Sequence, residues 1–304
     1  MSLSLKIHPQ ASRLLNVEAD AVPKFIGACL EEHRRQLVAQ SESVMKDSPE
    51  SAVTLVEIAD FPTVCVKEFR WRGCRHAVKG LFRTTQGLRT YRNGWRLIKA
   101  HVGAAAPLAH IREKRMGLTA SEWVVMEVIP HALEMDRYIL DRERQPWLIS
   151  EKRAFTVLFG RFMGCLHAAG IFHSDLKTCN ILVSLNAAPR EPVAHHTGHP
   201  CDQEDAGRRM PRFFLLDYDA VLEFWQVPER RRIKNLLQIF LSTPIAVRAT
   251  DRLRFLSEYA LHMGLTPHER RKTARQVLDA ARGKEILYVG FDGDVREQWE
   301  LPRR

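Results

Sequence analysis

The stretch of sequence that most plainly carries chemistry is "IFHSDLKTCNILVS", residues 171–184. It places Asp175, Lys177 and Asn180 inside an otherwise apolar run. A charged side chain that leaves water must be paired or must take part in function. The pattern therefore indicates a functional site on a loop that follows a helix and precedes a short strand.

Two further segments add groups suited to the same chemistry, because "VCVKEF" contains Lys67 and "FFLLDYD" contains Asp217. Transfer of the γ-phosphoryl group of ATP needs neutralised phosphate charge, oxygen ligands for a metal ion and a carboxylate beside the incoming hydroxyl. Asp175 and Lys177 are the expected catalytic residues, the first accepting or orienting the hydroxyl proton and the second contacting the transferred phosphoryl. We expect Asn180 and Asp217 to bind Mg²⁺ through oxygen, and Lys67 to hold the α- and β-phosphates.

These segments resemble the motifs of the protein-kinase-like fold. The pattern H-x-D-L-K-x-x-N is matched position by position, by His173, Asp175, Leu176, Lys177 and Asn180. "VCVK" is similar to the V-A-I-K strand, and "LLDYD" stands where D-F-G would. "VVMEVIP" resembles the hinge strand, which implies that the backbone at Glu127 contacts adenine.

The later part of the chain resembles one branch of that fold. "RRRIKNLLQIFLSTP" and "DRLRFLSEY", together with "HSDLKTCNILV" and "LLDYDAV", are similar to the lipopolysaccharide kinase family of the Kdo/WaaP type. The resemblance implies an α+β, protein-kinase-like two-lobed fold with a small β-rich N-lobe and a larger helical C-lobe. It also implies a kinase that uses ATP with Mg²⁺, or alternatively Mn²⁺, to phosphorylate a sugar (heptose or Kdo) of the lipopolysaccharide inner core.

The segment after Asp219 bears on the size of the acceptor. It runs "AVLEFWQVPERRRIKN" into a helix, without an A-P-E motif or a long activation segment to support an extended peptide. A compact acceptor such as a sugar fits this better than a protein does. Two alternatives stay open: a protein Ser/Thr kinase, and a pseudokinase scaffold that binds nucleotide without turnover.

The first lobe departs from the kinase pattern at its phosphate-binding turn. No G-x-G-x-x-G precedes Lys67, and the corresponding turn is "KDSPES", residues 46–51. We therefore expect the phosphates to meet Ser48, Ser51, Lys46 or backbone amides.

The expected partner of the lysine is also missing. No acidic residue occurs between positions 69 and 112, so the helix in that region cannot give Lys67 a glutamate. Arg92 and Asn93 stand in the corresponding place. Glu68 is adjacent in sequence, but alternation along a strand directs it to the opposite face.

Apolar periodicity predicts the elements that position these residues. Helices are expected at 23–40, about 83–101, 151–170 and 230–282, strands at 51–58, 63–71, 122–130, 180–184 and 212–217, and a hairpin within "EILYVGFDGDVREQW".

Four divisions of the chain are expected. They are an N-terminal helical extension (1–40), an N-lobe with the nucleotide-binding strands (41–130), a C-lobe with the catalytic loop (131–304), and within it a flexible insertion at 185–211, which is polar and aperiodic.

Composition limits the partners. Lys+Arg 46 against Asp+Glu 36 gives a net charge of +10, which suits an anionic partner. No motif combines basic and stacking aromatic residues, so nucleic acid is not expected. With the family resemblance, the expected partner is inner-core lipopolysaccharide or a lipid-linked sugar acceptor.

Cysteine usage and hydropathy bear on the compartment. The six cysteines form no C-x-x-C pair, which is typical of reduced thiols. The first residues lack the apolar core of a signal peptide, and no run reaches the ~18 apolar residues of a spanning helix. We expect a cytoplasmic protein, and peripheral contact with the anionic cytoplasmic face of the inner membrane is a further expectation to test.

Overall fold

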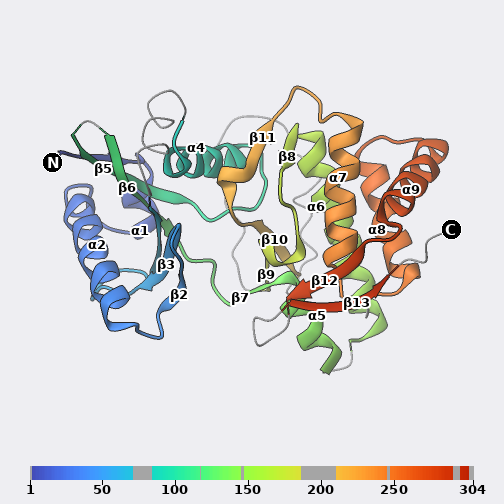
Figure 1. The fold of residues 1–304 in the computed structure, drawn as a ribbon, viewed down its shortest axis with the longest axis horizontal. Helices are drawn as coiled ribbons and strands as arrows, with labels where there is room; N and C mark the ends of the chain where they lie inside the picture. The colour runs from blue at the N-terminus through green and yellow to red at the C-terminus, as the bar shows by residue number, and fades with distance from the viewer. Residues whose placement is uncertain are drawn as a thin grey trace. The chain divides into compact units, whose positions relative to one another are not determined.

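The chain forms two compact units, a β-rich one and a helical one (Figure 1). The computed structural model describes residues 2–70, 84–116, 118–144, 147–185, 210–244, 247–289 and 295–300. Unit 1 comprises Met1–Ile98 and Ala104–Val128, and unit 2 comprises Lys99–Gly103 and Ile129–Arg304. The α+β class with a β-rich and a helical lobe is confirmed.

Unit 1 is built on a six-stranded antiparallel sheet in the order β1-β5-β6-β4-β3-β2. Its strands are β1 (Ser2–Ile7), β2 (Val44–Asp47), β3 (Ser51–Val56), β4 (Val64–Arg70), β5 (Pro107–Arg115) and β6 (Leu118–Glu127). Its helices are α1 (Ala11–Leu15), α2 (Ala21–Ala39) and α4 (Gln86–Lys99, of which the last residue falls in unit 2).

The two faces of this sheet have different roles. Val64 and Val66 of β4 are buried in one cluster with Phe25 and Ile26 of α2. Alternation along the strand directs Lys67 to the other face, where its side chain is partly exposed. The apolar face therefore holds the sheet on α2, and the other face can present polar groups.

The first strand of the chain lies at one edge of this sheet. β1 pairs with β5 from Ser2↔Lys114 to Ile7↔Ala109. The strand is mostly exposed, so its sequence lacks the buried apolar run by which we predicted the other strands.

The described part of unit 2 contains five α-helices and several short strands. The helices are α5 (Met135–Arg144), α6 (Ile149–Ala168), α7 (Glu229–Ser242), α8 (Ala249–His262) and α9 (Pro267–Ala281). The strands are β7 (Ala132–Glu134), β8 (Ile171–His173), β9 (Ile181–Ser184), β10 (Arg212–Leu215), β11 (Val221–Glu223), β12 (Glu285–Val289) and β13 (Val295–Glu300). β12 pairs with β13, which confirms the predicted terminal hairpin.

A sharp turn leads from α6 to the catalytic loop. α6 ends at Ala168, and Gly170 follows with φ +75°, a conformation that favours glycine. A Cβ at this position would collide with the Phe224 carbonyl. The Phe224 amide donates to the Gly170 carbonyl at 2.8 Å, so the chain beyond β11 lies against the start of β8.

The predicted insertion joins two adjacent strand ends. β9 and β10 are antiparallel neighbours, and Ser184 pairs with Arg212. Of the predicted insertion 185–211, residues 186–209 lie outside the described residues.

The interpretation of all six cysteines as reduced thiols is wrong at Cys165, which is disulfide-bonded. Cys29, Cys65 and Cys179 are free. Lack of a C-x-x-C pair does not exclude a bridge between positions far apart in the sequence, so spacing was a poor guide here.

Candidate active site

Three of the predicted residues meet on the loop between β8 and β9. Lys177 Nζ lies 3.1 Å from Asp175 Oδ1, and both side chains are about half exposed. Asn180 donates from Nδ2 to the Asp175 carbonyl at 2.8 Å. The loop thus presents a carboxylate and an ammonium group to solvent, with the asparagine fixed beside them.

Hydrogen bonds hold the backbone of this loop almost residue by residue. The Ser174 amide donates to the Ala220 carbonyl at 2.9 Å, and the Asn180 amide to the Lys177 carbonyl at 3.0 Å. The Thr178 amide donates to Ser242 Oγ at 3.0 Å. Because its amides are already paired, the loop has little freedom to rearrange before substrate binds.

His173 is a buried support for the loop. Its Nδ1 accepts from the Asp175 amide at 3.2 Å, so its Nε2 carries the proton and donates to the Leu216 carbonyl at 3.0 Å. Burial lowers the pKa of His173, despite the opposing influence of Asp217 and Asp175. The neutral imidazole therefore joins the segment carrying Asp175 to the segment carrying Asp217.

One face of α7 supplies polar side chains to the loop. Gln238 accepts from the Leu176 amide at 3.3 Å and donates to the Ser174 carbonyl at 3.0 Å. Ser242 lies one turn further along α7 and receives the Thr178 amide. Our sequence reading missed this role, although "NLLQIFLS" repeats polar residues at helical spacing within an apolar run.

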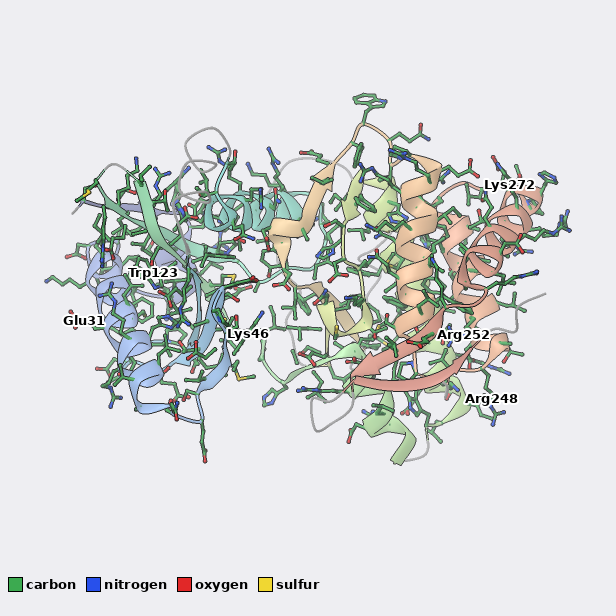
Figure 2. The ribbon with its side chains drawn as sticks, in the orientation of Figure 1. Glu31, Lys46, Trp123, Arg248, Arg252 and Lys272 are labelled. Atoms are coloured by element: carbon green, nitrogen blue, oxygen red, sulfur yellow. The ribbon has the colours of Figure 1, made fainter. Side chains whose placement is uncertain are left out.

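A partly buried arginine fixes the C-terminal end of α7. Arg252 of α8, labelled in Figure 2, donates to the carbonyls of Phe240 at 3.1 Å, Thr243 at 3.2 Å and Val247 at 3.2 Å. Its guanidinium also lies 4.6 Å from the centre of the Phe240 ring. Burial lowers the pKa of Arg252 to about 10, so the group stays charged at neutral pH. A cation suits the negative end of the helix dipole.

Asp217 follows β10 in a left-handed conformation, with φ 51° and ψ 53°. The preceding amide, that of Leu216, donates to the Asn180 carbonyl at 2.9 Å. The two predicted metal ligands are therefore tied together through the backbone. Their donor set fits Mg²⁺, because Asp217 supplies a carboxylate and Asn180, whose Nδ2 is held by Asp175, keeps Oδ1 as its acceptor.

Lys67 shares a face of the unit 1 sheet with a second lysine. The strand pairing places Lys46 opposite Val53, and Val53 opposite Lys67. Directly paired residues point to the same face, and two strand spacings are about 10 Å. Lys67 Nζ lies 5.2 Å from the centre of the Phe69 ring.

The prediction that Glu68 faces away from Lys67 is confirmed. Glu68 Oε2 lies 3.7 Å from His33 of α2 and accepts from Arg70 Nε at 2.9 Å. Burial alone would raise the pKa of Glu68, but the hydrogen bond from Arg70 and the nearby His33 outweigh it and lower that pKa.

A strand carboxylate, which the sequence did not reveal, fastens α4 to the sheet. Glu122 of β6 is fully buried and accepts from Thr85 Oγ1 at 2.5 Å and from the Gly87 amide at 3.2 Å, at the start of α4. It also accepts from His110 Nε2 at 3.0 Å. Here the glutamate lies on a strand of the sheet and binds the start of the helix. The kinase pattern would instead place a glutamate on the helix.

The residues predicted to contact the phosphates (Ser48 and Ser51) and adenine (Glu127) form hydrogen bonds within the protein. Ser48 Oγ donates to the Ser51 carbonyl at 2.9 Å and accepts from the Ser51 amide at 3.2 Å, closing the β2–β3 turn. The Glu127 amide donates to the Ala106 carbonyl at 3.0 Å, and the Glu127 carboxylate accepts from the Ala106 amide at 3.0 Å. Any contact of the Glu127 backbone with adenine would therefore use its carbonyl oxygen.

A large apolar cavity lies elsewhere in unit 2. It measures about 1160 Å³ and is lined by residues of α5 to α9, including Phe155 and Phe240. None of the predicted site residues is among the described residues that line it.

Comparison with known proteins now decides the family. The model of the "Lipopolysaccharide kinase (Kdo/WaaP) family" matches residues 35–259. The chain belongs to this family. It is therefore a phosphotransferase of the kinase class, in a family of lipopolysaccharide biosynthesis.

Two individual proteins are similar to this chain. The lipopolysaccharide core heptose(I) kinase WaaP of Pseudomonas aeruginosa is 24% identical over 199 residues, covering 64% of this chain and 68% of that protein. The solved structure of WaaP in complex with acyl carrier protein has a TM-score of 0.52 at 20% identity, covering 90% of this chain and 99% of the other. At that identity the structural likeness shows the fold alone.

Among the described residues, no helix combines the length and apolar character needed to cross a bilayer.

Proposed function

We propose that this protein transfers the γ-phosphoryl group of ATP to a hydroxyl of an inner-core sugar of lipopolysaccharide. Family membership supports the substrate class, and the named activity of the Pseudomonas relative favours a heptose over Kdo. The observation that carries the proposal is the catalytic loop, where Asp175, Lys177 and Asn180 are held by paired backbone amides and by α7.

Asp175 would act on the acceptor hydroxyl. As the sugar oxygen forms its bond to the γ-phosphorus, the bond from that phosphorus to the β-phosphate oxygen breaks and ADP leaves. The hydroxyl proton passes to the Asp175 carboxylate, or is oriented by it. Lys177, 3.1 Å from that carboxylate, would attract the transferred phosphoryl.

Asp217 and Asn180 would hold Mg²⁺, or Mn²⁺ in its place, through a carboxylate and an amide oxygen. The metal, when bound, supplies neutralisation of phosphate charge. His173 contributes by keeping the Leu216 carbonyl, and hence the adjacent Asp217, in register with the loop.

In unit 1 we propose that Lys67 and Lys46 face the phosphates of ATP from the sheet. Their shared face supports this role. We propose that the Glu127 carbonyl contacts adenine. Ser48 and Ser51 would contribute through the geometry of the β2–β3 turn, because the Ser48 hydroxyl closes it.

The short connection after Asp217 supports a compact acceptor. Only a 3₁₀ turn, the three-residue strand β11 and a turn separate Asp217 from Glu229 at the start of α7. No long segment is available there to support an extended peptide. We propose that the lipid-linked sugar is met at the cytoplasmic face of the inner membrane.

The test is transfer of labelled phosphate from ATP to purified, dephosphorylated inner-core glycolipid, with a basic protein as competing acceptor. We expect label on the glycolipid with magnesium or manganese, located on heptose by mass spectrometry. Label on the basic protein alone would instead support a protein kinase. Nucleotide binding without label on either acceptor would support a pseudokinase scaffold.

A further inference from the structure

A fully exposed tryptophan stands in the turn between β11 and α7. Of the tryptophans whose side chains the structure describes, Trp95 and Trp123 are buried and Trp147 is partly buried. Trp225, by contrast, is 103% exposed, and nearby Leu222 is 44% exposed. An indole in water leaves a large apolar surface uncovered, whereas at a lipid–water interface both its ring and its N–H are accommodated.

Basic side chains follow this turn along the chain. The first turns of α7 carry Arg230, Arg231 and Lys234. Arg231 lies 5.0 Å from the centre of the Phe224 ring, next to Trp225, so the cation and the turn form one packed unit. The ring contact holds the cation against the residue that precedes Trp225 in the chain.

The basic surface continues on α9. Lys272, labelled in Figure 2, forms an ion pair with Glu229 at 2.8 Å and so joins the start of α9 to the start of α7. Arg271 and Arg275 are exposed on the same helix. Three carboxylates lie in β11 and the first turns of α7 and α9: Glu229 is offset by this pair, and Glu223 and Glu269 are the others. The local charge is therefore clearly positive.

The strand pairing links this turn to the catalytic loop. β11 pairs with β8 at Val221↔His173, two residues before Asp175. Trp225 follows Val221 by four residues, about 13 Å along an extended chain. A surface that bound the Trp225 turn would lie within a short, fixed distance of the catalytic carboxylate.

We propose that the Trp225 turn (Phe224–Pro228), with Leu222 and the basic residues of α7 and α9, docks on an anionic lipid bilayer. One inserted indole beside several cations is the composition of an interfacial anchor. The apolar part is small for a stable protein interface, which needs roughly 800 Å² on each partner. The inference rests on the proposed function in one respect, since a lipid-anchored acceptor explains why the anchor lies near Asp175.

The binding test uses the full chain and vesicles containing either phosphatidylglycerol or phosphatidylcholine alone. We expect sedimentation with the anionic vesicles, and quenching of Trp225 fluorescence by brominated acyl chains. Trp225→Ala should weaken binding at least fivefold, while Trp225→Phe should retain binding but lose most of the quenching. Met116→Ala removes an equally exposed side chain from unit 1 and should change nothing.

Charge is tested by a matched pair. Arg230→Glu should weaken binding about fivefold or more, because each basic residue near an anionic surface contributes substantially. Lys24→Glu, at an exposed position of α2, should have a much smaller effect. Equal loss in both variants would indicate attraction by net charge and would overturn the assignment to this surface.

An activity arm separates this inference from the proposed function. Trp225→Ala should lower transfer to vesicle-embedded glycolipid and spare transfer to the same oligosaccharide after removal of its acyl chains. If wild type binds vesicles but labels neither acceptor, the proposed function fails while the anchor stands. Unchanged vesicle binding by Trp225→Ala, or capture of an acidic carrier protein through Trp225 without vesicle binding, would overturn the anchor.

Discussion

Asn235 of α7 donates from Nδ2 to the carbonyl oxygen of His173, 2.6 Å away. The oxygen of the same amide accepts from His167 Nε2 of α6 at 3.2 Å and lies 3.4 Å from the His173 amide nitrogen. The hydroxyl oxygen of Tyr259 of α8 lies 2.9 Å from His167 Nδ1, which adds a third helix to the network. One buried side chain thus connects three helices to the strand that starts the catalytic loop.

Truncating this amide should damage both stability and transfer. Asn235→Ala leaves the backbone of His173 without its partner, a loss of about 1–3 kcal/mol in the free energy of unfolding. We expect a lower melting temperature and a kcat reduced more than the affinity for ATP. Arg230→Ala, exposed on the same helix, is the control for thermal stability and should melt close to wild type. Wild-type kcat in Asn235→Ala would show that α7 does not position the loop.

Two buried histidines predict a loss of stability in mild acid. Burial lowers the pKa of His167 from 6.5 to about 4, and burial also lowers that of His173. As pH falls below 6.5 the unfolded chain binds protons that the folded chain does not. The contribution of His167 is therefore full above pH 6.5 and falls towards pH 4, by about 1.4 kcal/mol per pH unit. His173 adds a loss of the same sign.

Denaturant unfolding at several pH values checks this sign. His167→Gln can still donate to Asn235 and accept from Tyr259, so it should fold and should show a shallower fall between pH 6.5 and 4. An identical slope in wild type and variant would contradict the role assigned to His167.

The anchoring of α4 by Glu122 can be tested with an isosteric change. Glu122→Gln keeps one oxygen for Thr85 and His110 but turns an N–H group towards the Gly87 amide, or the reverse. One donor is left unsatisfied in a fully buried site, so we expect a loss of about 1–3 kcal/mol. The measurement is chemical denaturation, with Glu31→Gln as an exposed control on α2 (Figure 2). Equal stability of both variants would show that Glu122 does not hold α4.

The insertion should be replaceable, because it joins strand ends that already pair at Ser184↔Arg212. Replacing residues 187–209 with a short Gly/Ser turn should change the melting temperature by only a few degrees and preserve ATP turnover. Failure of this deletion to fold would show that the segment is structural.

The sequence predicted those site residues that lie close together along the chain. Asp175, Lys177 and Asn180 lie within six positions, and the structure brings them together on one loop. The helix predicted at 151–170 is observed as Ile149–Ala168, because its apolar period is strong and a glycine follows it.

The residues missed are those that act across the fold. Gln238 and Ser242 contact partners 62 to 64 positions away, and Glu122 contacts residues 35 and 37 positions away. Their roles arise only when helices and strands pack, so no local pattern marks them. β1 was missed for a related reason, since its place depends on the free edge of β5 and not on an apolar run of its own.

The central claim is that Asp175 acts on the acceptor hydroxyl whereas Asp217 binds the metal. Two isosteric variants test these roles separately. Asp217 has φ 51°, a conformation that asparagine tolerates well, so Asp217→Asn should fold and report on charge alone. Asp175→Asn should keep Mg-ATP affinity nearly unchanged.

The decisive measurement is the affinity for Mg-ATP and the rate of phosphoryl transfer to inner-core glycolipid, in wild type and both variants. Asp175→Asn should lower transfer by roughly 10²-fold or more with nucleotide affinity kept, as expected for loss of a positioned base. Asp217→Asn should weaken metal-dependent nucleotide binding as well as transfer. If both variants transfer phosphate at the wild-type rate, or if Asp175→Asn loses nucleotide binding as Asp217→Asn does, the account of this site is contradicted.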